Sequence, residues 1–153
     1  MTVEKTLDYG LLWRIATHPS IYRLTSDDFS PLPGRWKVAE RVDSHYLLAT
    51  TANEILGFCA FYPENGVCWQ AHICFLPCAY GEKTRSAFAL MLKWMWAKTR
   101  AQRIWGAIPT YNTLAIKFAK EAGFQFCGRN FDSWQKHGKL YDMILLGISR
   151  PKP

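Results

Sequence analysis

The run LPCAYGEKTRS, residues 76–86, combines a glycine with basic side chains where a predicted strand gives way to a predicted helix. Main-chain N–H groups at a helix N-terminus, together with the helix dipole, attract anions such as phosphate. Gly81 would let a ligand approach the main chain closely, and Lys83 and Arg85 add positive charge. The run therefore predicts a phosphate-binding turn, although an ordinary strand-to-helix turn with solvated charges fits the same residues.

Two side chains ahead of this run are candidates for acid–base chemistry. His72 lies in a strand-like segment, and an ordinary histidine pKa of about 6.5 suits a general base. A histidine packed on a sheet fits the same position. Glu64, in the turn ENG, is a weaker candidate, because a glutamate in a turn is typically solvated. Asp142, near a predicted strand start, is expected to bind turn amides instead.

The stretch YNTLAIKFAKEAGF, residues 111–124, reads as a short helix with a polar start and a glycine stop. Asn112 is a favourable N-cap residue, a role that needs no function. Gly123 is placed to end the helix in a left-handed conformation.

The cysteines and histidines do not form a metal-binding pattern. Five cysteines occur without a CxxC pair, and the four histidines show no ligand spacing with them. Reduced structural thiols and no metal site are therefore predicted.

The spacing of hydrophobic residues predicts the elements that would position these side chains. Apolar residues at helical spacing over 7–24, broken at His18-Pro19, indicate two short helices within an N-terminal region of residues 7–28. The elements predicted after this region are strands 44–52, 55–63, 67–77, 103–109, 124–131 and 139–149, and helices 82–100 and 112–122. This order predicts one mixed α/β (α+β) domain over residues 1–153.

Composition narrows the class of protein. The 153 residues are 49% hydrophobic, which allows a sizeable core, and no apolar run reaches the length of a membrane span. The charged N-terminus lacks an apolar signal core, so a cytoplasmic protein is expected. The net charge of +7 favours an anionic partner. Because the basic residues are spread along the chain, a phosphorylated small molecule is favoured over nucleic acid, which rests on charge alone.

The order strand–Pro–turn–helix–strand–NxxA helix–GF–strand–strand, over residues 44–149, resembles the GNAT superfamily of acetyl-CoA-dependent N-acetyltransferases. The likeness is greatest to the branch that acetylates ribosomal-protein N-termini, and it rests on Gly123, Phe124, Gly128, Arg129, Gly138 and Asp142. The resemblance implies a mixed, mostly antiparallel sheet of six or seven strands flanked by helices. It also makes residues 44–149 the cofactor-binding core.

The resemblance further implies how acetyl-CoA would bind. The strand end would hold the pantetheine arm through its main chain, and the next loop and helix start would wrap the pyrophosphate. The residues so implied are Phe75, Leu76, Pro77, Tyr80, Gly81, Glu82, Lys83, Thr84, Arg85, Ser86, Asn112 and Phe118. Two departures stand out: Lys83 and Arg85 replace the later glycines of the family loop. Ala119 stands where many members carry a tyrosine that protonates the leaving thiolate.

The resemblance implies acetyl transfer to a primary amine, either a protein N-terminus or a small amine, by direct attack with His72 or Glu64 as base. The alternative is a catalytically weak or inactive GNAT-like binding protein, of the kind found in tailed phages with a role in head assembly, which would act in the host cytoplasm. Trp94 and Trp96 cannot share one helix face, so one of them is expected to be exposed and to serve a homo-oligomer or another protein partner.

Overall fold

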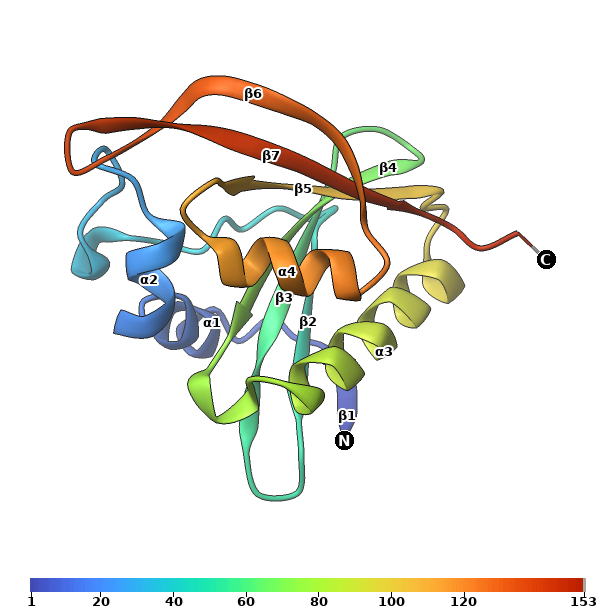
Figure 1. The fold of residues 1–153 in the computed structure, drawn as a ribbon. Helices are drawn as coiled ribbons and strands as arrows, with labels where there is room; N and C mark the ends of the chain where they lie inside the picture. Colours follow the sequence, from blue (N-terminus) through green and yellow to red (C-terminus); the bar gives the residue numbers. More distant parts are fainter. Residues whose placement is uncertain (153) are drawn as a thin grey trace.

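A computed structural model describes residues 1–152, and its centre is one seven-stranded sheet in the order β1-β2-β3-β4-β5-β7-β6 (Figure 1). The strands are β1 (Thr2–Lys5), β2 (His45–Thr50), β3 (Ile55–Pro63), β4 (Cys68–Phe75), β5 (Arg103–Pro109), β6 (Gln125–Lys136) and β7 (Lys139–Ser149). Neighbouring strands are antiparallel except β4 and β5, which run parallel. The predicted mixed, mostly antiparallel sheet is therefore confirmed.

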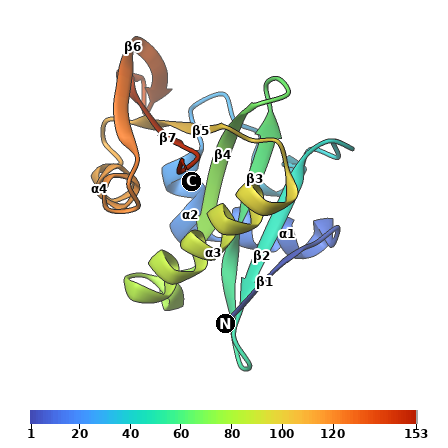
Figure 2. The same cartoon turned by 90° about the vertical axis from the view of Figure 1, so that its right-hand side faces the viewer.

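Helices cover both faces of this sheet (Figure 2). They are α1 (Tyr9–Ala16), α2 (Pro19–Thr25), α3 (Glu82–Lys98) and α4 (Thr113–Glu121), with short 3₁₀ turns η1 (Pro33–Arg35) and η2 (Pro77–Ala79). Pro19 opens α2 as predicted, because a proline needs no N–H partner in the first turn. Within residues 1–152 no helix is long and apolar enough to cross a membrane.

Alternation along the strands produces two cores. Tyr46 and Leu48 of β2 pack in the core beneath α1 and α2, whereas Leu47 and Ala49 pack in the core beneath α3. Successive side chains of a strand point to opposite faces, so one strand serves both cores. The same alternation places Cys74 of β4 with α1 and α2 and puts Phe75 with α3.

The strand β1 was not predicted, and it raises the strand count from six to seven. It pairs antiparallel with β2, with Val3 opposite Ala49. Its sequence TVEK is mostly exposed, so it carries no apolar alternation that a reader of the sequence could detect. The strand β6 is also longer than predicted and reaches Lys136. The predicted strand ended too early because bulges after Phe126 and Asn130 interrupt the apolar pattern in the sequence.

The prediction that one of the α3 tryptophans is exposed is wrong. Trp94 and Trp96 are both half-buried and pack against the core beneath α3. The His45 ring meets the edge of Trp94, with 5.2 Å between ring centroids. On the other side the Arg150 guanidinium, beyond β7, donates to the main-chain oxygen of Trp96. Neither tryptophan is therefore exposed, although Lys93, Ala97 and Lys98 of the same helix face solvent.

Candidate active site

The strands β4 and β5 diverge, and this divergence opens the sheet (Figure 1). They pair only from Cys68 with Arg103 to Gln70 with Trp105, so across the described strands residues 71–75 of β4 have no partner on this edge. The N–H of Leu76 donates to Leu56 on the β3 side, at 2.8 Å. Because main-chain groups alternate along a strand, those of Ile73 and Phe75 face the opening.

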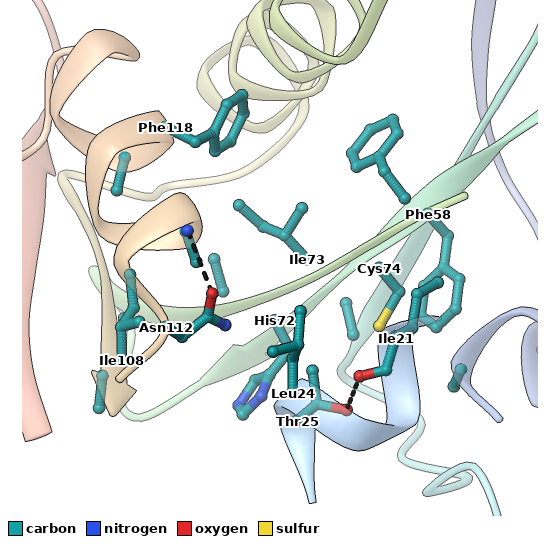
Figure 3. Close-up of a pocket in the computed structure, with 18 of the residues that line it drawn as sticks. Ile21, Leu24, Thr25, Phe58, His72, Ile73, Cys74, Ile108, Asn112 and Phe118 are labelled. Carbon is teal, nitrogen blue, oxygen red and sulfur yellow. Dashed lines mark hydrogen bonds between the residues drawn. The ribbon is translucent and has the colours of Figure 1, made fainter. Parts of the chain in front are cut away.

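A cavity of about 630 Å³ occupies this opening, and residues of β3, β4, β5, β7, α2, α3, α4 and the loop before β2 line it. Seven of the predicted site residues line it, namely His72, Phe75, Tyr80, Gly81, Thr84, Asn112 and Phe118. Figure 3 shows Asn112 and Phe118 of α4 on one side of the cavity and Ile21, Leu24 and Thr25 of α2 on another. The remaining predicted cofactor residues adjoin lining residues in the sequence but do not line the cavity themselves. They are Leu76, Pro77, Glu82, Lys83, Arg85 and Ser86.

The N-terminus of α3 lies at one end of the cavity. Gly81 precedes the helix with a φ of 94°, a left-handed conformation that favours glycine. The first main-chain bond of the turn runs from Arg85 N to the Gly81 oxygen at 3.2 Å, which leaves the N–H groups of Glu82, Lys83 and Thr84 for outside partners. The Thr84 hydroxyl donates to the Ala79 oxygen at 2.8 Å and fixes the turn. This helix start can therefore bind an anion.

The basic side chains of this turn are engaged by carboxylates. Lys83 Nζ lies 2.5 Å from Glu54 Oε2, and the pKa of Lys83 is raised because the Glu54 carboxylate accepts its hydrogen bond. Arg85 contacts Glu82 at 2.9 Å and Glu121 at 3.7 Å. All these groups are exposed, and exposed ion pairs are weak, so a phosphate could displace them. In this structure the main chain, rather than Lys83 or Arg85, presents positive character to the cavity.

The helix α4 begins and ends as predicted. The Asn112 side chain accepts from Ala115 N at 3.2 Å, which caps the helix. Gly123, with a φ of 92°, ends it, and the bonds from Gly123 N to Lys120 O and from Phe124 N to Ala119 O form a Schellman motif. Asn112 and Ala119 lie two turns apart and both line the cavity.

His72 points into the cavity from β4 (Figure 3). Its ring packs edge-on against Tyr62, with 5.2 Å between centroids, and the Arg41 guanidinium lies 5.2 Å from the Tyr62 ring on β3. Burial, and then the positive charge of Arg41, lower the pKa of His72 below its ordinary value. Protein atoms surround the imidazole on several sides, yet His72 is an exposed residue because the cavity opens to solvent. A neutral imidazole at neutral pH is the form that a general base requires.

Glu64 is not brought to this site. It lies in the hairpin between β3 and β4, where its N–H bonds to the Cys68 oxygen, and it is exposed outside the cavity. His72 sits further along β4, opposite Ala60. Glu64 is therefore too distant in the fold to share the chemistry of His72.

Asp142 has the structural role that was predicted. Its carboxylate accepts from Asp132 N at 2.9 Å and from Arg129 Nε at 2.6 Å. These bonds, first the one from the Asp132 amide, lower the pKa of Asp142. They hold the bulge of β6, where Asp132 adopts a φ of 49°.

Sequence reasoning missed the wall formed by α2 and β3, namely Ile21, Leu24, Thr25 and Tyr62. The α2 residues looked like an ordinary amphipathic helix, because the same apolar face serves the core and the cavity. All five cysteines are free thiols, and residues 1–152 hold no cluster of three ligands suited to a metal ion.

No family model matches the chain, and no curated protein matches its sequence. Solved structures do match. The ribosomal-protein-alanine N-acetyltransferase of Brucella melitensis is 15% identical, with a TM-score of 0.76 over 98% of this chain and 100% of that one. The spermidine N-acetyltransferase of Vibrio cholerae, solved with CoA and spermine, is 13% identical, with a TM-score of 0.78 over 97% of this chain and 94% of that one.

This chain has the GNAT fold. The fold implied by the resemblance is thereby confirmed over nearly the whole length of the chain. In this GNAT fold, the open edge of β4 and the start of α3 lie on one cavity, and His72 lies further along the same strand.

Proposed function

We propose that the chain is an N-acetyltransferase that transfers the acetyl group of acetyl-CoA to a primary amine. The observation that carries the proposal is the open edge of β4, which leads along one cavity to the start of α3. Amide groups of a pantetheine arm suit a strand edge, and a pyrophosphate suits a helix N-terminus. The GNAT fold of the chain, and a solved neighbour that holds CoA, support the same cofactor.

The residues present fit such a cofactor. Ile73 and Phe75 would hold the pantetheine arm through the β4 main chain. The N–H groups of Glu82, Lys83 and Thr84 would hold the pyrophosphate. A Cβ on Gly81 would meet no atom within 4 Å, so open space lies over this turn. Asn112, which caps α4, and Phe118 within α4 would contact the pantetheine arm from the opposite side of the cavity.

When bound, acetyl-CoA supplies an acetyl group activated as a thioester. The chain positions an amine beside it, and the amine nitrogen bonds to the carbonyl carbon as the carbon–sulfur bond breaks. A main-chain N–H of the open β4 edge would polarise the carbonyl, and His72 would take the amine proton and pass it to solvent. Ala119 has no acidic group, so the departing thiolate takes its proton from solvent. We place this activity in the cytoplasm, where acetyl-CoA is available.

A second candidate is a GNAT fold that binds partners without catalysis. Two observations favour it: Ala119 lacks an acidic group for the leaving thiolate, and Lys83 and Arg85 already form ion pairs with Glu54 and Glu82. A role in phage head assembly stays a prediction within this reading, as does a partner surface. Among residues 1–152 the exposed tryptophan is Trp13, and its Nε1 already donates to the Pro33 oxygen at 3.0 Å.

Calorimetry with acetyl-CoA, followed by thiol release over a panel of amines, tests the proposal. Micromolar binding and amine-dependent release of CoA are expected. Absence of binding at millimolar acetyl-CoA would refute the proposed activity. Binding without turnover on any amine, together with unchanged behaviour of a His72→Ala, Asn112→Ala double variant, would favour the second candidate.

A further inference from the structure

In the proposed reaction, the amine would bind in the part of the cavity that adjoins His72 on the α1–α2 side of the sheet. We call it the acceptor half, and we define it by residues on the α1–α2 side of the sheet and around its rim: Ile21, Leu24, Thr25, Trp36, Lys37, Tyr62, His72 and Met143. His72 and Cys74 point to this side because β4 alternates, and Cys74 packs in the core beneath α1 and α2. His72, Leu24 and Thr25 are all among the lining residues drawn in Figure 3.

This acceptor half lacks negative charge. Among the residues of the described chain that line the cavity, none is aspartate or glutamate, and Lys37 is the one permanently charged side chain. A second cation lies near the cavity, since the Arg41 guanidinium is 5.2 Å from the ring centroid of the lining residue Tyr62. The electrostatic character of the acceptor half is therefore neutral to positive.

Two carboxylates follow the lining residue Ser26 in the loop after α2, and both are held by other groups. Asp28 accepts from His137 N at 2.6 Å and from Gly138 N at 2.8 Å, which anchors the loop after α2 to the β6–β7 turn. Asp27 accepts from Phe29 N at 3.0 Å and from Ser30 Oγ at 2.7 Å within the same loop. Neither aspartate lines the cavity.

From this lining we propose that the acceptor is a primary amine with one amino group on an apolar, preferably aromatic, body and without a second positive charge. The inference rests on the proposed acetyl transfer and names its substrate class. Burying a second ammonium without a carboxylate is costly, and Lys37 and Arg41 would repel it. Leu24, Tyr62 and Trp36 instead favour a hydrocarbon or an aromatic ring. A small arylalkylamine and a peptide with an apolar N-terminal residue share this chemistry.

A matched pair of amines tests whether a second positive charge on the acceptor is disfavoured. Hexylamine and 1,6-diaminohexane differ in the second amino group alone. The kcat/KM of the protein is expected to be at least about ten-fold higher for hexylamine, and phenethylamine should exceed spermidine by about 100-fold. Equal or higher kcat/KM for the diamine would overturn the inference. Phenethylamine and a short peptide beginning with phenylalanine, run side by side, distinguish the two sources of the amine.

Variants at Lys37 test whether the lining sets this preference. Lys37 is exposed on the loop before β2 and takes no part in the core or the proposed chemistry. Lys37→Glu should reduce the ratio of kcat/KM for hexylamine to kcat/KM for 1,6-diaminohexane by at least about three-fold. Lys37→Gln should reduce the same ratio by a smaller factor. An unchanged ratio in both variants would contradict the role of the lining charge.

A binding measurement keeps the inference testable if turnover is absent. Chemical shifts of the aromatic side chains, recorded with CoA-saturated protein, report each amine at the acceptor half. Saturation by hexylamine at a lower concentration than by diaminohexane supports the inference, and the reverse order overturns it. Failure of the proposed function has a separate signature, which is absence of acetyl-CoA binding in calorimetry.

Discussion

Gly57 of β3 lies directly opposite Phe75 of β4, and the two backbones approach so closely that a Cβ atom on Gly57 would lie 2.6 Å from the Phe75 Cα. The same Cβ would lie 2.3 Å from the Cys74 oxygen. Gly57 also has a φ of 150°, which a side chain disfavours. This contact fixes the path of β4 at the residue where its open edge meets the cavity.

The substitution Gly57→Ala is therefore expected to destabilise the fold by about 3 kcal/mol or more, because main chain rather than a flexible side chain must move. Urea unfolding followed by tryptophan fluorescence measures the change. Gly66→Ala is the control, because its Cβ would meet nothing within 4 Å. Similar stability of the two variants would contradict the close approach.

Gly81→Ala separates folding from anion binding. The Cβ at position 81 meets no atom within 4 Å, so the cost to the free protein is the backbone strain at a φ of 94°, about 1–2 kcal/mol. Acetyl-CoA affinity is expected to fall about ten-fold, because the pyrophosphate must approach this turn closely. Calorimetry on the folded variant gives the affinity, with Gly34→Ala as the comparison. An unchanged affinity would place the pyrophosphate elsewhere.

The ion pair between Lys83 and Glu54 competes with a bound phosphate. Glu54→Gln should leave Lys83 free to turn toward the anion, so the Kd for acetyl-CoA should fall about three-fold at low salt. The gain should shrink at high salt, where exposed charges are screened. Glu64→Gln, a change of the same type in the next hairpin, should leave the Kd unchanged. A weaker affinity in the Glu54 variant would mean that the pair organises the site.

Asn112 combines a helix cap with a position on the cavity, and two substitutions separate these roles. Asn112→Ala removes the bond to Ala115 N and should cost about 1 kcal/mol of stability together with acetyl-CoA affinity. Asn112→Ser retains a capping oxygen on a shorter side chain, so its stability should stay near that of the wild type while its affinity falls. Thermal unfolding and calorimetry on both variants make the comparison. If Asn112→Ser keeps full affinity, Asn112 is a cap alone.

Elements with a strong apolar pattern could be predicted from the sequence. Elements whose position depends on tertiary contacts could not be predicted. The strand over 55–63 and the strand over 103–109 were predicted to the residue, because apolar and β-branched side chains fill them. The edge strand β1 could not be seen, since its side chains face solvent and its register depends on β2.

The candidate site was predicted in part for a similar reason. Gly81 and Asn112 are local signals of turn and cap, and a reader can find them in the sequence. The partner of Lys83 is 29 residues away, and the Tyr62–Arg41 contact joins a strand to a loop. Such pairings arise only when the sheet assembles, so no spacing in the sequence predicted the acceptor half.

The titration of His72 gives the last prediction. Burial, and then Arg41, lower its pKa, so the ring is neutral at pH 7 and becomes protonated only below its ordinary value of about 6.5. If His72 is the base, kcat/KM should rise with pH and level off once this group is neutral. His72→Gln should remove this inflection and lower kcat by about 100-fold or more. A pH–rate profile that keeps the inflection in His72→Gln would assign the base to another group.

The same shift has a consequence for stability. Because the folded-state pKa of His72 lies below the unfolded value, the unfolded chain binds the proton more tightly and stability falls as pH drops below about 6.5. His45 is shifted in the same direction by burial and by Lys5, so it contributes to the same loss. Urea unfolding at pH 7.5 and pH 5.0 should therefore show a smaller loss in His72→Gln than in the wild type. An equal loss in both proteins would mean that solvent in the open cavity stabilises the protonated form of His72, which would also weaken its case as the neutral base.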